Sequence, residues 1–207
     1  MTADEVIGLY WKYYLSLETQ VVELERYVEF DLKTNGNTYS SRFLELLQAI
    51  CSEVDVVGKV LATQCDPNFT PTQYTKIRNW WFYIQSNYSG IQLDPVFFRK
   101  ETIFPWENFF VMKCDSKYKD DSRVPDAALP SWWNSYNNVK HRRSDRFDDE
   151  LLYYTQANLS NVISALAGLY ILEVLLIERV HGSVDESNLF FCRGHRVFTF
   201  SFGGVGE

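Results

Sequence analysis

Residues 130–146 read PSWWNSYNNVKHRRSDR, and a long apolar segment, residues 151–180, follows them after a short acidic break. Pro130 suits the first turn of a helix, because its fixed φ and missing N–H cost nothing there. Asparagine is a poor helix former, so three asparagines within five positions require a reason from tertiary structure. Counted from Pro130 at 3.6 residues per turn, one helical face carries Asn134, Asn137 and His141.

This window admits three interpretations. In the first, the amides and the imidazole form a buried polar seam that fixes helix register, since buried amides need hydrogen-bond partners. In the second, His141 is a proton-transfer group oriented by the amides, while Lys140, Arg142 and Arg143 attract an anion. In the third, the window is simply a solvated helix face.

Composition sets the broad class of protein. A chain of 207 residues with 46% hydrophobic residues is long enough for one domain with a sizeable core. The net charge of −7 argues against a protein whose whole surface attracts nucleic acid. Residues 138–147 nevertheless carry a net charge of +3, so the sequence predicts a local basic patch.

The four cysteines show neither CxxC spacing nor a metal-ligand grouping, so we expect free thiols, no metal and no cofactor. The N-terminal residues lack a basic region and a cleavage signal, which predicts a cytoplasmic protein. The segment 162–177 is interrupted by Ser164 and Glu173 and falls short of a charge-free membrane span. We therefore expect a buried central helix and no membrane association.

Hydrophobic spacing predicts a mainly α-helical, up-and-down bundle of four to five long helices in a single domain, residues 1–207. The segment 91–129 is short-patterned, aromatic and interrupted by prolines, which indicates an insertion of strands or irregular structure. The tail, residues 184–207, alternates in hydrophobicity and predicts a C-terminal β-hairpin. The expected helices cover residues 2–28, residues 41–62, a stretch from Pro71 to before Gly90, a helix from Pro130, and a last helix that begins near Asp148.

Glu53 is the one carboxylate that the spacing of the 41–62 helix carries towards its apolar face. It is either a boundary carboxylate that captures a cation from another helix or an acceptor for His141 and its basic neighbours. The candidate binding residues are accordingly Trp133, Asn134, Arg142 and Glu53.

The order of long helices, with a polar motif that ends in histidine shortly before the last apolar helix, resembles the HEPN superfamily of small, often dimeric helical bundles. His141 matches the family histidine, and Asn137 matches the polar residue that follows the family arginine. The arginine position itself holds Tyr136. The resemblance covers residues 1–88 and 130–181.

Many members of that superfamily are metal-independent ribonucleases of bacterial toxin–antitoxin and phage-defence systems. The resemblance implies attack by an RNA 2′-hydroxyl on the adjacent phosphate, with His141 moving a proton beside Asn137 and with Arg143 or Lys140 replacing the absent arginine. It also implies RNA as substrate, a homodimer, and an antitoxin or defence partner protein. The alternative is a non-catalytic interaction module that recognises an anionic ligand or a partner protein.

Overall fold

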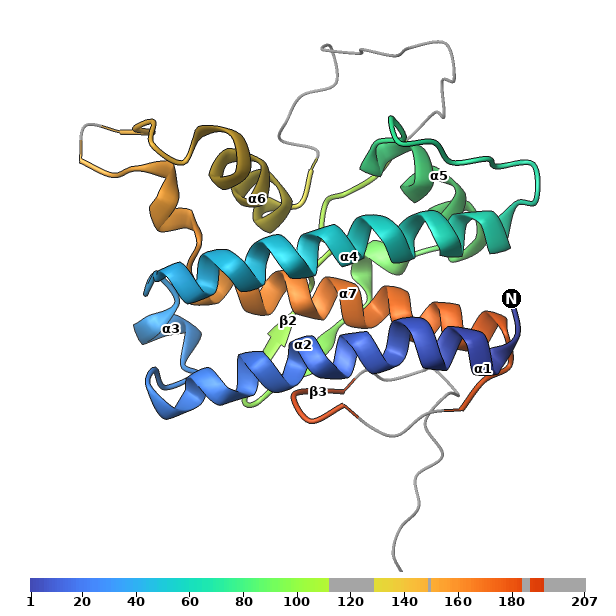
Figure 1. The fold of residues 1–207 in the computed structure, drawn as a ribbon, viewed down its shortest axis with the longest axis horizontal. Coiled ribbons are helices and arrows are strands. Elements are labelled where there is room, and N and C mark those ends of the chain that lie inside the picture. The colour runs from blue at the N-terminus through green and yellow to red at the C-terminus, as the bar shows by residue number, and fades with distance from the viewer. Residues whose placement is uncertain (112–128, 149, 184–186, 192–207) are drawn as a thin grey trace, which may run out of the picture.

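The computed structural model describes residues 1–111, 129–148, 150–183 and 187–191. It confirms a mainly helical fold with a small antiparallel sheet, as the hydrophobic spacing predicts. Three helices, α2 (Lys12–Val22), α4 (Ser41–Cys65) and α7 (Leu159–Arg179), lie side by side (Figure 1). Helices α5 (Ile77–Asn87) and α6 (Ser131–Arg142) lie beyond α4. The fold is therefore organised around long helices, with the sheet and the shorter helices packed around them.

The N-terminal arm follows the predicted helix 2–28 in outline but changes its winding twice. Thr2 and Glu5 form a reciprocal capping box that begins the helix, with backbone-to-side-chain bonds of 2.8 and 3.3 Å. A wider π-helical turn then interrupts it, and a tighter 3₁₀ turn ends it. The elements in order are α1 (Ala3–Val6), the π-helix η1 (Ile7–Trp11), α2 (Lys12–Val22), the 3₁₀ helix η2 (Glu23–Arg26) and the short α3 (Leu32–Asn35).

Helices α4 (Ser41–Cys65) and α7 (Leu159–Arg179) form the central pair, and they run parallel. Their N-terminal ends are joined where the Leu159 N–H donates to the Thr38 carbonyl at 3.0 Å. Their C-terminal ends are joined where the Arg179 guanidinium donates to the Gln64 carbonyl at 3.0 Å. Because parallel neighbours need a long return connection, everything between residues 66 and 158 serves as that connection.

Two predicted helix starts are wrong. Helix α5 (Ile77–Asn87) begins six residues after Pro71, because residues 72–75 close a turn in which the Thr72 N–H donates to the Thr75 hydroxyl at 2.8 Å. Helix α7 begins at Leu159 rather than near Asp148, because Asn158 is extended and its side chain caps the Asn161 N–H at 3.0 Å. In both cases a local side-chain bond, rather than the hydrophobic period, sets the boundary.

The described part of the insertion, residues 91–111 and 129, is strand-like and irregular, as predicted. Strand β1 (Val96–Phe98) pairs with β2 (Glu101–Ile103) and with β3 (Phe190–Phe191) in the order β2–β1–β3, all antiparallel. Most of the predicted C-terminal hairpin, including its turn, lies outside the described residues. The remaining elements are η3 (Ile91–Leu93), β1 (Val96–Phe98), β2 (Glu101–Ile103), α6 (Ser131–Arg142), the 3₁₀ helix η5 (Tyr153–Gln156) and β3 (Phe190–Phe191).

Glu18, a fully buried carboxylate of α2, holds the segment before β3 in place. It accepts the Tyr14 hydroxyl at 2.7 Å, the Asn188 N–H at 2.9 Å and the Asn188 amide at 3.0 Å, and it also accepts the Ser187 hydroxyl. Because burying a charge is costly without such bonds, this set both satisfies Glu18 and ties the chain after α7 to α2.

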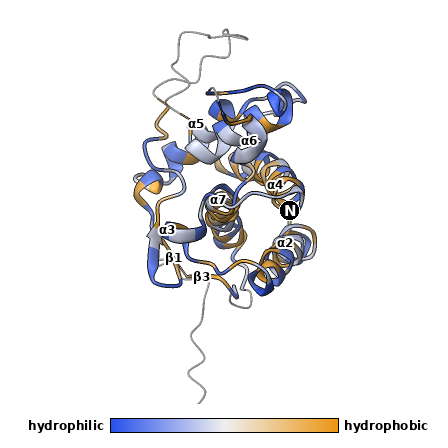
Figure 2. Ribbon diagram, turned by 90° about the vertical axis from the view of Figure 1, so that its left-hand side faces the viewer, coloured by the Kyte–Doolittle hydropathy of each residue, from blue (hydrophilic) through white to orange (hydrophobic). Residues whose placement is uncertain are grey.

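Helix α7 lies at the centre of the core. Seen along the bundle, its apolar surface is surrounded by α2, α4, α6 and the strands (Figure 2). By length and composition α7 could cross a membrane, but 83% of its most apolar window is buried inside the protein. The expected central helix is therefore confirmed.

Gly58 of α4 tests how closely α5 packs. A Cβ at this position would lie 2.7 Å from the Trp80 ring, which is fully buried and whose indole N–H donates to Asp55 at 3.0 Å. We expect Gly58→Ala to lose about 1–3 kcal/mol through overpacking, which exceeds the gain of about 1 kcal/mol in helix propensity. Urea denaturation measures the change.

Gly8 provides the matched control, because nothing lies within 4 Å of a Cβ added there. Gly8→Ala is expected to leave stability unchanged or to raise it by up to about 1 kcal/mol. Equal effects of the two substitutions would contradict the packing described for Trp80.

Candidate anion-binding site at the end of α6

Helix α6 begins at Ser131 after Pro130, as the sequence predicts, and a chain of tryptophans holds it in place. The Trp132 indole N–H donates to the Pro105 carbonyl at 2.7 Å, and its ring meets Trp106 edge-on at 5.1 Å. Trp106 in turn donates to the Gly168 carbonyl of α7 at 3.2 Å. These bonds fix the orientation of α6 relative to the core.

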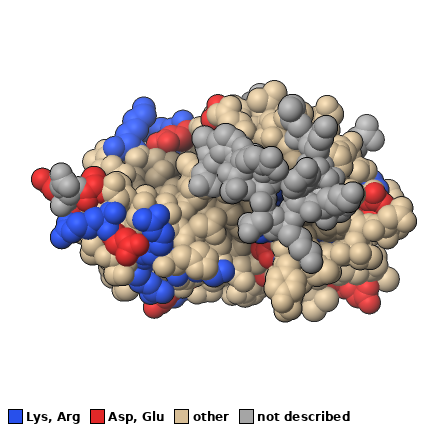
Figure 3. Space-filling model, turned by 90° about the horizontal axis from the view of Figure 1, so that it is seen from above, with Lys and Arg blue, Asp and Glu red and all other residues tan. Residues whose placement is uncertain are grey.

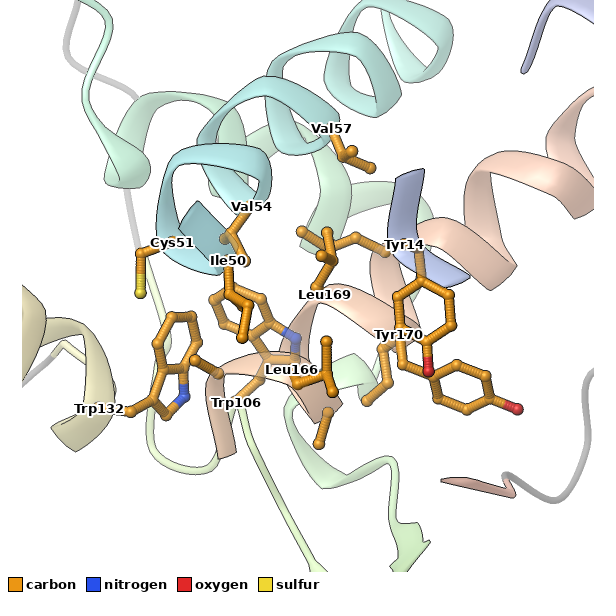
Figure 4. Packing of buried hydrophobic residues seen from close by; sticks show 14 of the residues in the cluster. Tyr14, Ile50, Cys51, Val54, Val57, Trp106, Trp132, Leu166, Leu169 and Tyr170 are labelled. Carbon is orange, nitrogen blue, oxygen red and sulfur yellow. The ribbon is translucent and has the colours of Figure 1, made fainter. Parts of the chain in front are cut away.

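Gly168 allows this close approach. A Cβ at this position would lie 3.0 Å from the Trp132 ring and 3.4 Å from the Trp106 ring. Figure 4 shows Trp106 and Trp132 together beside Ile50 and Cys51 of α4. The two indoles therefore fill the space between α4, α6 and α7, and the opposite side of α6 must face outward.

The outward side carries the predicted polar stripe. At about 100° per residue, Asn134, Asn137 and His141 lie opposite the buried side of the helix. The three asparagines are half-buried and His141 is exposed to solvent. Asn134, Asn137 and His141 share one face of α6, as the helical period predicts. The His141 imidazole is exposed, however, and does not lie in a sealed polar seam.

Two of the asparagine amides bind neighbouring segments of the chain rather than His141. Asn138 donates to the Gln156 side chain at 3.2 Å, and Asn134 donates to the Leu129 carbonyl at 3.5 Å. Gln156 was not among the predicted site residues. Its backbone carbonyl also accepts a hydrogen bond from the Asn161 side-chain amide at 2.8 Å. The asparagines therefore anchor the two segments that flank α6.

Lys140 and Arg142 leave the helix on opposite flanks of His141, because each lies about 100° from it around the axis. The Lys140 ammonium donates to the Tyr136 hydroxyl at 3.2 Å and lies 5.3 Å from the centre of that ring. Its charge also reaches α4, where burial raises the pKa of the Cys51 thiol and Lys140 opposes that rise. Lys140 is thus drawn towards α4 and away from His141.

Arg142 and Arg143 differ in what they contact. Arg142 donates to Asp145 at 3.1 Å and lies 4.8 Å above the Tyr153 ring. Arg143 is exposed, and within the described ranges its guanidinium has no carboxylate partner. Of the predicted cations, Arg143 is therefore the most available for an incoming anion.

The segment after α6 folds back as a small hairpin of residues 143–148 and 150–154. The Phe147 N–H donates to the Leu151 carbonyl at 3.1 Å and the Tyr154 N–H donates to the Arg143 carbonyl at 3.1 Å. Asp148 and Glu150 lie in the same hairpin as Arg143 and Arg146, and basic and acidic side chains are mixed at this end of the molecule (Figure 3). The local charge is more balanced than the window of residues 138–147 predicts.

Exposed aromatic rings accompany these charges. The Phe147 ring is 42% exposed and contacts the Tyr153 ring at 5.5 Å, and Tyr39 is 50% exposed and meets the Tyr154 ring at 5.8 Å. The sequence analysis did not include these rings among the site residues, although Phe147, Tyr153 and Tyr154 lie within a dozen positions of Arg143. Together, the outward surface of residues 141–148 and 150–154 combines cations with aromatic rings, and we call it the α6 tip.

Two predicted binding residues lie elsewhere. Trp133 is 7% exposed and packs against Trp132 and Tyr136 at ring distances of 5.7 and 5.3 Å, so its role is in the core. Glu53 lies near Tyr10 and Glu173, with which it interacts electrostatically, and the structure does not bring it to His141. The spacing was right that Glu53 approaches an apolar face, but that face of α4 is turned towards η1 and α7.

A cavity of about 370 Å³ lies away from the α6 tip and is lined by Phe97, Arg99, Tyr170 and residues 187–191. In the part of the chain that the structure describes, no group of three or more His, Cys, Asp and Glu side chains could hold a metal ion. The α6 tip is therefore an exposed surface that is separate from this cavity.

Comparison of the chain with protein-family models, with curated proteins and with solved structures gives no match. The resemblance to the HEPN superfamily therefore stays a prediction, and the geometry of the α6 tip carries the functional argument.

The exposure of His141 separates a surface role from an architectural one. We expect His141→Ala to change the free energy of unfolding by less than about 0.5 kcal/mol, because the side chain lies in solvent. Val139→Ala, in the same helix but fully buried, should cost about 2 kcal/mol. Chemical denaturation of both variants checks this, and a large loss for His141→Ala would restore the polar-seam interpretation.

Proposed function

We propose that this protein is an RNA-directed binding module that recognises single-stranded RNA through the α6 tip. The observation that carries the proposal is the joint exposure of Arg143 and of the Phe147 ring on one hairpin, beside Arg142 stacked on Tyr153. Proteins that bind single strands combine cations that follow the phosphates with aromatic rings on which bases stack. An exposed surface with both features suits a flexible polyanion.

The same geometry favours binding over chemistry in a single chain. Cleavage of RNA needs, beside the group that moves the proton, a cation that stabilises the charge developing on the phosphate. Lys140 is bound to Tyr136 on one flank and Arg142 to Asp145 on the other, so neither meets His141. Recognition of an anion requires no such convergence.

The second candidate is the metal-independent ribonuclease that the HEPN resemblance implies. His141 favours it, because the imidazole is open to solvent on the face that also carries Asn137. On this proposal a homodimer brings Arg143 of one copy towards His141 of the other and so replaces the family arginine. A bacterial toxin–antitoxin or phage-defence setting in the cytoplasm, with an antitoxin or defence partner protein, belongs to the same proposal.

Fluorescence anisotropy with a labelled single-stranded RNA tests the binding proposal. Arg143→Gln should weaken binding and reduce the slope of log affinity against log salt by about 1, because one phosphate contact is lost. Phe147→Ala should weaken binding by about 1–3 kcal/mol through lost stacking.

Lys12→Gln is the matched control, since Lys12 is an exposed cation of α2 and its removal changes net charge by the same amount. If Arg143→Gln and Lys12→Gln behave alike, RNA does not bind at the α6 tip.

Cleavage assays in EDTA separate the two candidates. The binding proposal predicts that the RNA stays intact with wild type and with His141→Ala, although both bind it. Cleavage by wild type that His141→Ala abolishes would instead establish the ribonuclease, and a loss of about 10²–10⁴-fold is typical of a removed acid–base group.

A further inference from the structure

Glu173 is an ionisable side chain buried in the apolar core. It lies in the middle of α7 with an exposed fraction of 0%, and among the described residues neither carboxyl oxygen has a hydrogen-bond partner. Glu18 shows what a satisfied buried carboxylate looks like in this fold, with donors from Tyr14 and from residues 187–189. An unsatisfied buried carboxyl is costly, so Glu173 requires an explanation.

Two oxygen-bearing side chains from other helices lie within electrostatic range of Glu173. They are Glu53 of α4 and Tyr10 of η1. Burial, and then the charge of Glu53, raise the pKa of Glu173 well above its usual range. Burial also raises the pKa of Glu53, and burial followed by the two carboxyls raises that of Tyr10.

The junction is deep on one side and open on the other. Glu173 is sealed, whereas Glu53 and Tyr10 are half-buried and reach solvent. The Glu53 and Glu173 carboxyls interact electrostatically, yet no hydrogen bond joins them in the part of the chain that the structure describes. Helices α4 and η1 thus bring oxygen-bearing side chains within electrostatic range of Glu173, and neither side chain gives it a hydrogen bond.

The π-turn contributes to this arrangement. Helix η1, Ile7–Trp11, places Tyr10 on the side of the N-terminal arm that faces α4 and α7. Single π-turns inside α-helices are rare and occur often at functional sites, because the extra residue redirects side chains. The unusual winding and the unsatisfied carboxyl therefore lie at the same junction.

We propose that Glu173, Glu53 and Tyr10 form a site for a hard divalent cation at the junction of η1, α4 and α7. Carboxylate and phenol oxygens are the ligands that Mg²⁺, Ca²⁺ and Mn²⁺ prefer, and no nitrogen or sulfur ligand is required. Two carboxylates balance the charge of one divalent ion in a low-dielectric setting. Water on the open side completes the coordination, as is common for Mg²⁺.

Such an ion would join the N-terminal arm to the central helix pair. Without it, folding keeps Glu173 protonated or leaves a charge buried, and with it the three side chains share one counter-ion. The site is independent of the α6 tip, because Glu53 is turned away from His141.

Differential scanning calorimetry of wild type, Glu173→Gln and Glu53→Gln tests the proposal in EDTA and with MgCl₂, CaCl₂ or MnCl₂. We expect at least one of these ions to raise the Tm of wild type, since a ligand of the folded state stabilises it. Both glutamine variants should lose that rise. Glu23→Gln, which removes an exposed glutamate, should keep it.

The pH dependence provides a second readout. In EDTA the folded state holds the Glu173 proton more tightly than the unfolded chain does, because the pKa of Glu173 is raised on folding. Tm should therefore fall as pH rises above the ordinary carboxyl range. The Glu173→Gln variant should show a smaller fall. Because the cation competes with that proton, the metal-induced rise in Tm should grow with pH.

Mn²⁺ electron paramagnetic resonance measures binding directly, with loss of the bound signal expected in Glu173→Gln even if that variant is more stable than wild type. No rise in Tm with any of the three ions, or a rise that persists in Glu173→Gln, overturns the proposal and leaves Glu173 as a buried neutral acid.

Discussion

The contact of two indole rings with one glycine holds the rest of this structure together. Gly168 lets Trp132 and Trp106 approach the backbone of α7, and each indole N–H has a backbone carbonyl to donate to. Buried tryptophans contribute large apolar areas, but they also need a partner for the N–H. Because both needs are met at this point, α6 has one orientation, and its amides and His141 must face outward.

The sequence predicted those parts of the fold that depend on local rules. The amphipathic spacing of α4 and the proline before α6 were sufficient to locate both helices, since period and backbone restriction act within a few residues. The starts of α5 and α7 were wrong, because the turn closed by Thr72 and Thr75 and the cap formed by Asn158 overrode the hydrophobic pattern. The parallel course of α4 and α7 depends on contacts between distant residues, and no local pattern encodes it.

The candidate site was predicted in part for the same reason. The helical period places Asn134, Asn137 and His141 together, and they lie on one face. The partners of the polar and charged residues could not be predicted, because they depend on how the chain folds after α6. Asp145 and Tyr153 contact Arg142, and Gln156 accepts a hydrogen bond from Asn138. Glu53 shows the limit of a helical wheel, which identifies a face but not the helix that the face meets.

The α6 tip and the Glu173 junction illustrate two ways in which a protein places polar groups. At the α6 tip, mixed charges remain in water, where exposed ion pairs contribute little to stability and are available to a ligand. At the junction, a carboxyl is removed from water, where lack of a partner is costly. We expect a function at both places. At the α6 tip the charged side chains are accessible to a ligand, and at the junction the Glu173 carboxyl lacks a hydrogen-bond partner.

We propose that α6, held by Trp132, presents His141 and its neighbouring arginines to an anionic ligand in solvent. The most direct measurement is the ¹H–¹³C spectrum of the three histidine imidazoles while single-stranded RNA is added, with the His141 signal assigned by its loss in His141→Gln. The account predicts that the His141 signal shifts with RNA concentration while that of His181, at the far end of α7, stays fixed. A His141 signal that does not move, while RNA binding is evident from other resonances, would contradict it.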